Sequence, residues 1–105
     1  MTIETIEKLI STKQAVMLYF SGNDCGVCEA LKPKIKDAFA SNFPKIEQVF
    51  IQANEYKEIS SHFGVFSVPT ILVFLEGKEF ARKSRNISVP GFIQELNRPY
   101  QIMIS

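Results

Sequence analysis

The sequence predicts an α/β fold with a mixed central sheet of about four strands and helices on both faces. Residues 15–20, "AVMLYF", are apolar without alternation, which is typical of a strand buried on both faces. Helix-like and strand-like segments alternate up to about residue 64, which favours parallel strands joined by a right-handed crossover helix. Residues 70–84, "TILVFLEGKEFARKS", then read as an antiparallel hairpin.

In the first half of the chain, the pattern predicts a helix, a strand, a longer helix and a second strand. The first helix follows Thr2, a suitable cap, and its apolar residues recur at helical spacing: Ile3, Ile6, Leu9 and Ile10. After the strand at 15–20, a helix is expected from about Gly26 to Ala40, with a kink at Pro33. Residues 46–53, "IEQVFIQA", form the second predicted strand.

The second half adds a short helix, the hairpin and a last helix. Residues 54–64 predict a helix that ends at Gly64. The hairpin turn falls at 76–78, and Ser88 can cap a helix that runs to about Asn97. We therefore expect one domain over residues 1–105. Residues 98–105 form a C-terminal tail that either packs on this domain or meets a second copy.

Composition argues against several classes of partner. Twelve basic and eleven acidic residues give a net charge of +1, so no charge excess favours nucleic acid or an anionic membrane. The first 13 residues lack the apolar core of a secretory signal, and the longest apolar runs are too short to span a bilayer. We expect a cytoplasmic monomer that binds neither nucleic acid nor membrane.

Both cysteines of the chain lie in one motif, Cys25-Gly26-Val27-Cys28, at the junction of a buried strand and a helix. Residues three apart in a first helical turn face the same side, within reach of a disulfide. The helix N-terminus stabilises a thiolate there. Gly26 leaves the outer thiol open, so Cys25 is the natural attacking sulfur and Cys28 the resolving one.

Other uses of the pair stay open at this point. Two idle core thiols would have the same spacing. A structural zinc site needs four ligands, and the chain offers two cysteines and one histidine, His62. A metal or cluster shared across a dimer is a third alternative.

Several motifs in order resemble the thioredoxin family: "YFSGNDCGVC", Pro33 five residues after the second cysteine, "GVFSVPT" and "FLEGKEF". The alignment runs from about Lys13 to Leu96 without a gap. The resemblance implies a thioredoxin fold whose first strand is short or absent. It also implies a redox disulfide between Cys25, the nucleophile, and Cys28, the resolving cysteine. The Val68–Pro69 bond is expected to be cis, with the Val68 backbone pairing with a substrate strand.

The departures from the family pattern lie around the cysteine pair. Asp24 stands where the family often has tryptophan, Val27 where it has proline, and Arg85 where it has a groove glycine. The implied substrate groove therefore comprises Asp24, Gly26, Val27, Val68, Pro69 and Arg85. Beneath the pair, the family's buried aspartate and its lysine partner align with Tyr19 and Phe50. We expect Tyr19, Phe50 and Pro33 to lie behind the cysteine pair and to hold it in position without contacting the substrate.

These departures have predictable physical effects. Replacing the buried aspartate and lysine together leaves no orphaned charge, but it removes a proton acceptor, so Cys28 would need water or the Tyr19 hydroxyl instead. Asp24 and Glu29 are like charges to a thiolate, so we expect them to raise the pKa of the Cys25 thiol. A less stabilised thiolate favours the disulfide form, which is the reducing direction.

The resemblance implies a thiol-disulfide oxidoreductase, mainly a protein disulfide reductase. The chain has no nucleotide or flavin motif. We therefore expect no cofactor, with electrons coming from an upstream reductase and passing to disulfide-containing protein substrates. The alternative is a binding or adaptor module of the same fold with weak or specialised redox activity. An oxidase or isomerase fits the expected compartment and the acidic flanks less well.

Overall fold

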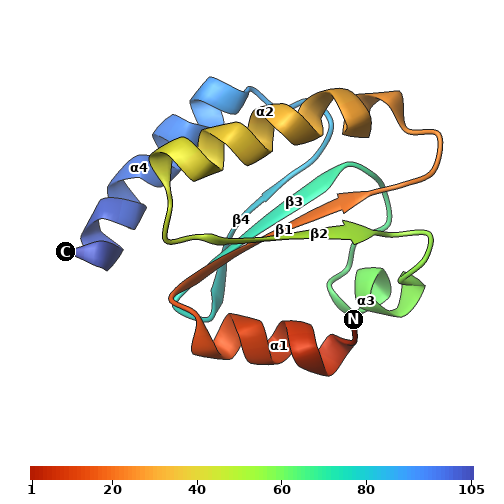
Figure 1. Ribbon diagram of the computed structural model, residues 1–105, viewed down its shortest axis with the longest axis horizontal. Coiled ribbons are helices and arrows are strands. Elements are labelled where there is room, and N and C mark those ends of the chain that lie inside the picture. Colours follow the sequence, from red (N-terminus) through yellow and green to blue (C-terminus); the bar gives the residue numbers. More distant parts are fainter.

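A mixed four-stranded sheet forms the centre of the molecule in the computed structural model, which describes residues 1–105. The chain order is α1 (Ile3–Thr12), β1 (Ala15–Ser21), α2 (Gly26–Asn42), β2 (Glu47–Gln52), α3 (Lys57–His62), β3 (Thr70–Leu75), β4 (Lys78–Lys83) and α4 (Val89–Ile104). The strand order is β2-β1-β3-β4, with β1 parallel to β2 and the other pairs antiparallel. Helices α2 and α4 cover one face, and α1 and α3 the other (Figure 1). The predicted fold class is confirmed, and no strand precedes α1.

Strand β1 divides the apolar interior into two cores. Alternate side chains point to opposite faces of a strand. Met17 and Tyr19 therefore pack with α2 and α4, whereas Leu18 and Phe20 pack with α1 and α3. All four are fully buried. Burying each such side chain contributes about 1.5–3 kcal/mol, so this strand anchors both layers.

Local capping fixes where the outer helices begin. The Thr2 hydroxyl accepts from the Thr5 amide at 3.1 Å, and the Ser88 hydroxyl accepts from the Gly91 amide at 3.2 Å. Both caps were predicted from the sequence. The hairpin turn also follows the prediction, since Glu76 and Gly77 both have positive φ, 51° and 82°, as a two-residue hairpin turn requires.

The last helix is longer than expected. It was predicted to end near Asn97, but α4 continues through Pro99 to Ile104. A proline inside a helix costs about 3 kcal/mol. The buried Tyr100 offsets this cost: its ring lies 4.9 Å from that of Phe43 and its hydroxyl accepts from the Lys45 amide at 3.0 Å. The predicted tail is therefore helix packed on the domain.

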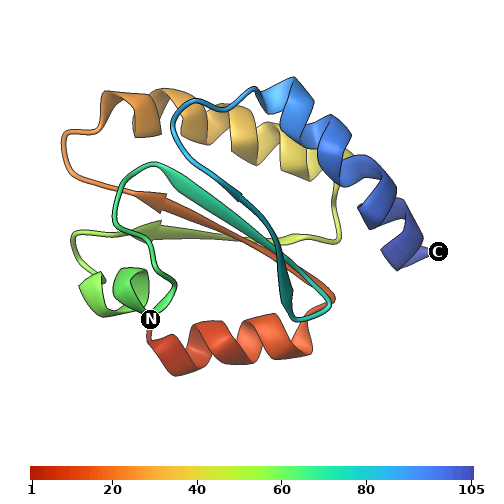
Figure 2. The same ribbon diagram turned by 180° about the vertical axis from the view of Figure 1, so that it is seen from behind.

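The two ends of the sheet differ in what they carry. The loop after β1 and the loop before β3 lie at one end, because Phe20 pairs with Thr70. The turn between β3 and β4 lies at the other end. The N-terminus lies beside α3, and α4 carries the C-terminus to the opposite side of the molecule (Figure 2).

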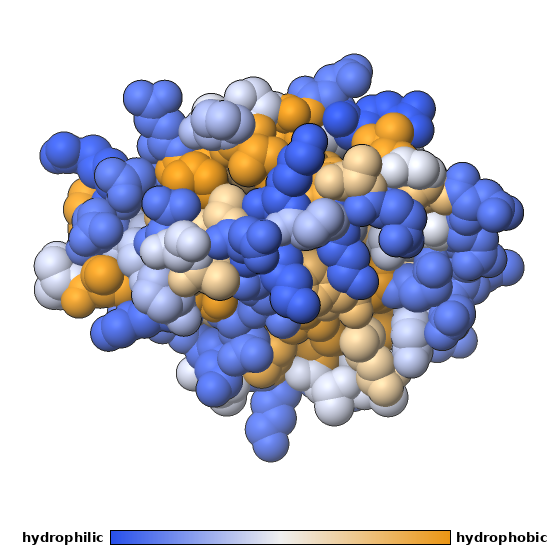
Figure 3. Space-filling view, turned by 45° about the horizontal axis from the view of Figure 1, so that its top comes forward, coloured by the Kyte–Doolittle hydropathy of each residue, from blue (hydrophilic) through white to orange (hydrophobic).

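On the face that carries α2 and α4, hydrophobic residues reach the surface in areas between hydrophilic ones (Figure 3).

Candidate active site

The cysteine pair lies where β1 gives way to α2. Cys25 is the N-cap of α2 and Cys28 lies in its first turn. The two are joined as a disulfide, with Cα atoms 5.2 Å apart, inside the usual range for this bond. The Cys28 amide donates to Cys25 Sγ at 3.1 Å. This amide has no acceptor within the helix, because it lies in the first turn. It points at Cys25 Sγ, where it would also stabilise a thiolate.

The two sulfurs differ in access. Cys28 is 1% exposed, whereas Cys25 is half-buried. Gly26 is exposed, and a Cβ placed on it would meet nothing within 4 Å. Val27 is 40% exposed beside it. A reactant arriving from solvent therefore meets Cys25 first, over an open and partly apolar surface.

Asp24 has a backbone role that its charge did not predict. Its φ is +52°, in the left-handed region that aspartate and asparagine enter more readily than most residues. Its side chain is exposed and forms none of the three ion pairs of the structure. The residue before the first cysteine therefore turns the chain into α2 while keeping a carboxylate at the rim.

The loop before the cysteines is held against two other segments. Asn54, after β2, accepts from the Asn23 amide through Oδ1 at 2.8 Å. A Cβ on Gly22 would stand 2.9 Å from Val68 Cγ2 and 3.0 Å from Asn54 Oδ1. Only glycine permits this close approach. Asn54 carries no signal in the sequence, because its partner lies 31 residues away in the chain.

The segment before β3 completes the surface. The Val68–Pro69 peptide bond is cis. Pro69 is buried, and the Thr70 hydroxyl donates to the Ser67 carbonyl at 2.7 Å across the turn. The pairing of Thr70 with Phe20 places this turn beside the end of β1. Val68 and Pro69 thus lie at the same end of the sheet as the cysteine pair.

Two aromatic residues occupy the positions beneath the pair. Tyr19 and Phe50 are direct partners across β1 and β2, and their ring centroids are 5.8 Å apart. The Tyr19 hydroxyl donates to the Cys28 carbonyl at 2.9 Å. The Lys32 ammonium lies 5.1 Å from the centre of the Phe50 ring, within reach of a cation–π interaction. The inner side of the site is therefore aromatic, with one hydrogen bond to the backbone of Cys28.

Tyr19 is not suited to accept a proton. Burial, helped by the negative charge of Glu29, raises the pKa of Tyr19 from 10.0 to about 12. The phenol therefore stays protonated near neutral pH, and its proton is directed at a carbonyl oxygen. The expectation that Tyr19 could be the proton acceptor for Cys28 is wrong, and water stays the predicted acceptor.

No ion pair or side-chain hydrogen bond joins the other residues singled out from the sequence to the cysteine pair. Arg85 is exposed between β4 and α4 and, like Asp24, forms no ion pair. Pro33 is exposed inside α2. His62 lies at the end of α3, 3.9 Å from the carboxylate of Glu7 in α1. Its nearest charged partner is therefore on another helix, away from the cysteine pair.

Arg82 holds the segment that leads to the cis bond, a role that no sequence motif indicates. Its guanidinium donates to the Phe63 carbonyl at 2.8 Å and to the Gly64 carbonyl at 3.2 Å. Glu79 accepts from the same group at 2.9 and 3.0 Å. Gly64 has φ +67°, so this arginine fixes a left-handed turn between α3 and Val68.

Two further features bear on function. The structure contains no group of three or more His, Cys, Asp or Glu side chains placed to hold a metal ion. None of its helices is both long enough and apolar enough to cross a membrane.

Comparisons with known proteins agree with this geometry. The thioredoxin family model matches residues 1–97. The thioredoxin-like protein YdfQ of Bacillus subtilis is 32% identical over 101 residues, covering 96% of this chain and 89% of its own. Thioredoxin 1 of Thermosipho africanus is 28% identical, with a TM-score of 0.76, and covers 86% of this chain and 99% of its own. Trxlp of Edwardsiella tarda has the same fold, with a TM-score of 0.81 at 16% identity over 93% of this chain and 96% of its own. With its cysteine pair at disulfide distance, the chain belongs to the thioredoxin family of thiol-disulfide oxidoreductases.

Proposed function

We propose that this protein works mainly as a protein disulfide reductase that uses a Cys25–Cys28 dithiol-disulfide cycle. The observation that carries the proposal is the pairing of an accessible sulfur with a buried one at the N-terminus of α2. A thiol that reacts first must be reachable, and a thiol that resolves must be close and shielded. Cys25 meets the first condition and Cys28 the second.

The cycle begins with the reduced protein. The Cys25 thiolate attacks one sulfur of a substrate disulfide, forming a mixed disulfide, and the other substrate sulfur leaves as a thiolate that takes up a proton. Cys28 then loses its proton to water and attacks Cys25 Sγ. The Cys25–Cys28 disulfide forms, the second substrate sulfur leaves as a thiol, and two electrons have passed to the substrate.

The surface beside Cys25 suits an extended substrate strand. Val68 precedes the cis bond and is half-buried at the edge of the site, where its backbone would pair with such a strand. Gly26 and Val27 leave the approach open on the other side. Asp24 and Arg85 would form the charged rim of this groove.

The carboxylates near the cysteine pair favour reduction of the substrate disulfide by this protein. The electrons must then come from another protein. Asp24 and Glu29 are exposed carboxylates on either side of the motif, and negative charge disfavours a thiolate. Because the chain has no nucleotide or flavin motif, the disulfide would be reduced again by an upstream reductase. We place this cycle in the cytoplasm and assign it to a monomer.

A second candidate function is a binding module with specialised redox activity. The observation that favours it is the aromatic pair Tyr19 and Phe50 beneath Cys28, which supplies no proton acceptor to the resolving step. Such a protein would recognise one partner through the groove and turn over slowly.

Reduction of insulin disulfides, with dithiothreitol as electron donor, distinguishes the two. We expect turnover by the wild type, none by Cys25→Ser, and trapped mixed disulfides with Cys28→Ser, because the resolving thiol is then missing. The absence of both turnover and trapped partners would contradict the reductase and favour the binding module.

A further inference from the structure

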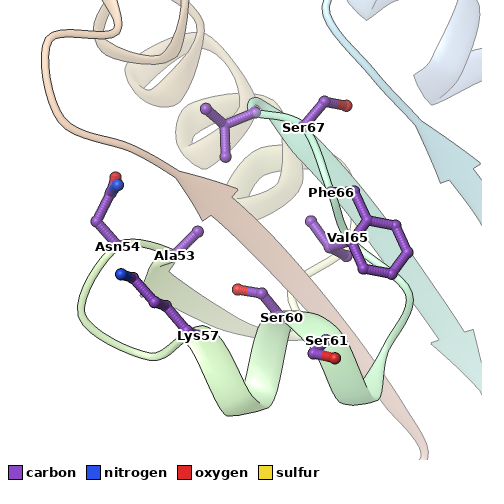
Figure 4. Close-up of a pocket in the computed structure, with 9 residues that line it drawn as sticks. Ala53, Asn54, Lys57, Ser60, Ser61, Val65, Phe66 and Ser67 are labelled. Carbon is purple, nitrogen blue, oxygen red and sulfur yellow. The ribbon is translucent and has the colours of Figure 1, made fainter.

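A cavity of about 300 Å³ opens beside the candidate active site and has no role in the chemistry described above. Its walls come from the segment after β2, from α3 and from the segment before the cis bond. Figure 4 shows Asn54 and Lys57 on one side of the cavity and Val65 and Phe66 on the other. The cavity therefore has a polar wall and an apolar wall.

The cavity shares residues with the active-site loop. Val68, which lines it, precedes the cis bond and lies against Gly22. Asn54, which also lines it, holds the Asn23 amide two residues before Cys25. A strand paired with the Val68 backbone would therefore pass the mouth of the cavity, and a neighbouring side chain of that strand could enter it.

The polar wall offers hydrogen-bond donors and a positive charge. Lys57 is the one titratable residue that lines the cavity, it is exposed, and it forms none of the three ion pairs. Because Asn54 Oδ1 accepts from a backbone amide, its other side-chain atom is an NH₂ donor. Glu55 and Glu58 flank Lys57 in sequence. They line the next hollow, which Asn54 and Lys57 also border, but neither glutamate lines this cavity. A carboxylate is the group that this wall complements.

The apolar wall is left uncovered. Phe66 is 85% exposed, the highest value among the exposed large hydrophobic side chains. Aromatic side chains with one open face contribute strongly when a partner covers them. Phe66 lies two residues before Val68, so a partner strand at Val68 would reach it as well.

We propose that this cavity is a specificity subsite for an acidic side chain close to the attacked cysteine of a disulfide-containing protein. The carboxylate would bind Lys57 and Asn54, and an apolar side chain of the same segment would cover Phe66. The inference rests on the proposed reductase function, and it names the class of substrate: an extended, acidic segment that carries the disulfide.

The test uses the full chain, pre-reduced with dithiothreitol and freed of it, in single-turnover stopped-flow reactions. The probes are peptides with an intrachain disulfide that differ only in one residue, Glu, Gln or Lys, placed within two positions of either cysteine. At low salt we expect the Glu peptide to react about two- to fivefold faster than the Gln peptide, the range of an exposed ion pair, and the Lys peptide to be slowest. Raising the salt concentration should shrink these differences.

Variants assign the preference to the subsite. Lys57→Gln should abolish the difference between the Glu and Gln peptides, and Lys57→Glu should reverse the order of the Glu and Lys peptides. Lys78→Gln removes the same charge at the opposite end of the sheet and should change nothing. Phe66→Ser should slow all peptides about fivefold, as loss of an aromatic contact does.

A neutral small disulfide, 2-hydroxyethyl disulfide, separates failure of the subsite from failure of the function. All these variants should reduce it at the wild-type rate. If the wild type reduces it but shows no charge preference, or if Lys57→Gln and Lys78→Gln alter the preference equally, the subsite is refuted. If the wild type reduces neither this disulfide nor any peptide, the proposed function itself fails.

Discussion

The region beneath the cysteine pair is buried and uncharged, whereas the proposed rim around the pair is exposed and charged. Beneath the pair, Tyr19 is fully buried, packs on Phe50 and makes one hydrogen bond, to the Cys28 carbonyl. Asp24, Lys57 and Arg85, which we propose form the rim, are exposed charges without ion-pair partners. The difference indicates a division of roles. We propose that the inner region sets the stability and position of α2, whereas the rim selects what reaches Cys25.

The largest effect should come from placing a charge in the inner region. Tyr19→Asp puts an unpaired carboxylate in a fully buried position, and we expect the free energy of unfolding to fall by about 3–5 kcal/mol. Urea denaturation measures the loss. The double variant Tyr19→Asp, Phe50→Lys should regain part of it, because the two side chains are cross-strand neighbours. If Tyr19→Asp is as stable as the wild type, the inner region does not depend on being uncharged.

A second substitution tests the close approach between the loop before the cysteines and the segment with the cis bond. Gly22→Ala places a Cβ 2.9 Å from Val68 Cγ2, which should cost about 1–3 kcal/mol and slow substrate reduction, because the segment with the cis bond must shift. Gly26→Ala is the matched control, since its Cβ meets nothing within 4 Å and should leave stability nearly unchanged. Equal losses in the two variants would contradict the proposed role of the close approach.

Alkaline pH tests the burial of the Tyr19 hydroxyl. The pKa of Tyr19 is raised from 10.0 to about 12 in the folded protein. Above pH 10, the unfolded chain therefore loses this proton before the folded protein does. Its contribution to stability is complete below pH 10 and is lost between pH 10 and 12, on the order of 2 kcal/mol.

Tyr19→Phe supplies the reference for this effect. The variant should be less stable than the wild type at pH 7, since the Cys28 carbonyl loses its partner. It lacks the titrating group, so the difference between the two proteins should narrow from pH 10 to 12. Parallel stability curves, measured by denaturant unfolding at each pH, would show that Tyr19 titrates normally.

The smallest effect is expected at Arg82, which holds the segment before Val68. Arg82→Gln removes the hydrogen bonds to the Phe63 and Gly64 carbonyls, yet the arginine is 40% exposed, so stability should fall by only about 1 kcal/mol. We expect a raised KM for insulin with little change in kcat, because the segment before Val68 is less well positioned. Arg98→Gln, an exposed arginine on α4, should leave both constants unchanged. A fall in kcat at constant KM would place Arg82 in the chemistry instead.

The fold could be predicted because its signals are local. The unbroken apolar run of β1, the caps Thr2 and Ser88, and the turn at Gly77 each depend on neighbouring residues. The end of α4 could not be predicted, because Pro99 reads as a helix breaker and the burial of Tyr100 against Phe43 depends on tertiary packing.

In the site, the motifs predicted the Cys25–Cys28 disulfide and the cis bond before Pro69. The roles of the other residues aligned with the family stay predictions. Asn54 and Arg82 were not predicted, because their contacts join residues 18 to 31 positions apart. The donor role of Tyr19 also needed the structure, which places its hydroxyl on a carbonyl.

The redox potential of the Cys25–Cys28 pair shows whether the protein can act as a disulfide reductase. The full chain would be equilibrated with graded ratios of reduced to oxidised glutathione or dithiothreitol, and the dithiol fraction counted by alkylation and mass spectrometry. We expect a potential more negative than the glutathione poise of a reducing cytosol, about −220 to −260 mV by biochemical extraction. A potential more positive than this range would make the pair an oxidant, and it would contradict the assignment of a protein disulfide reductase.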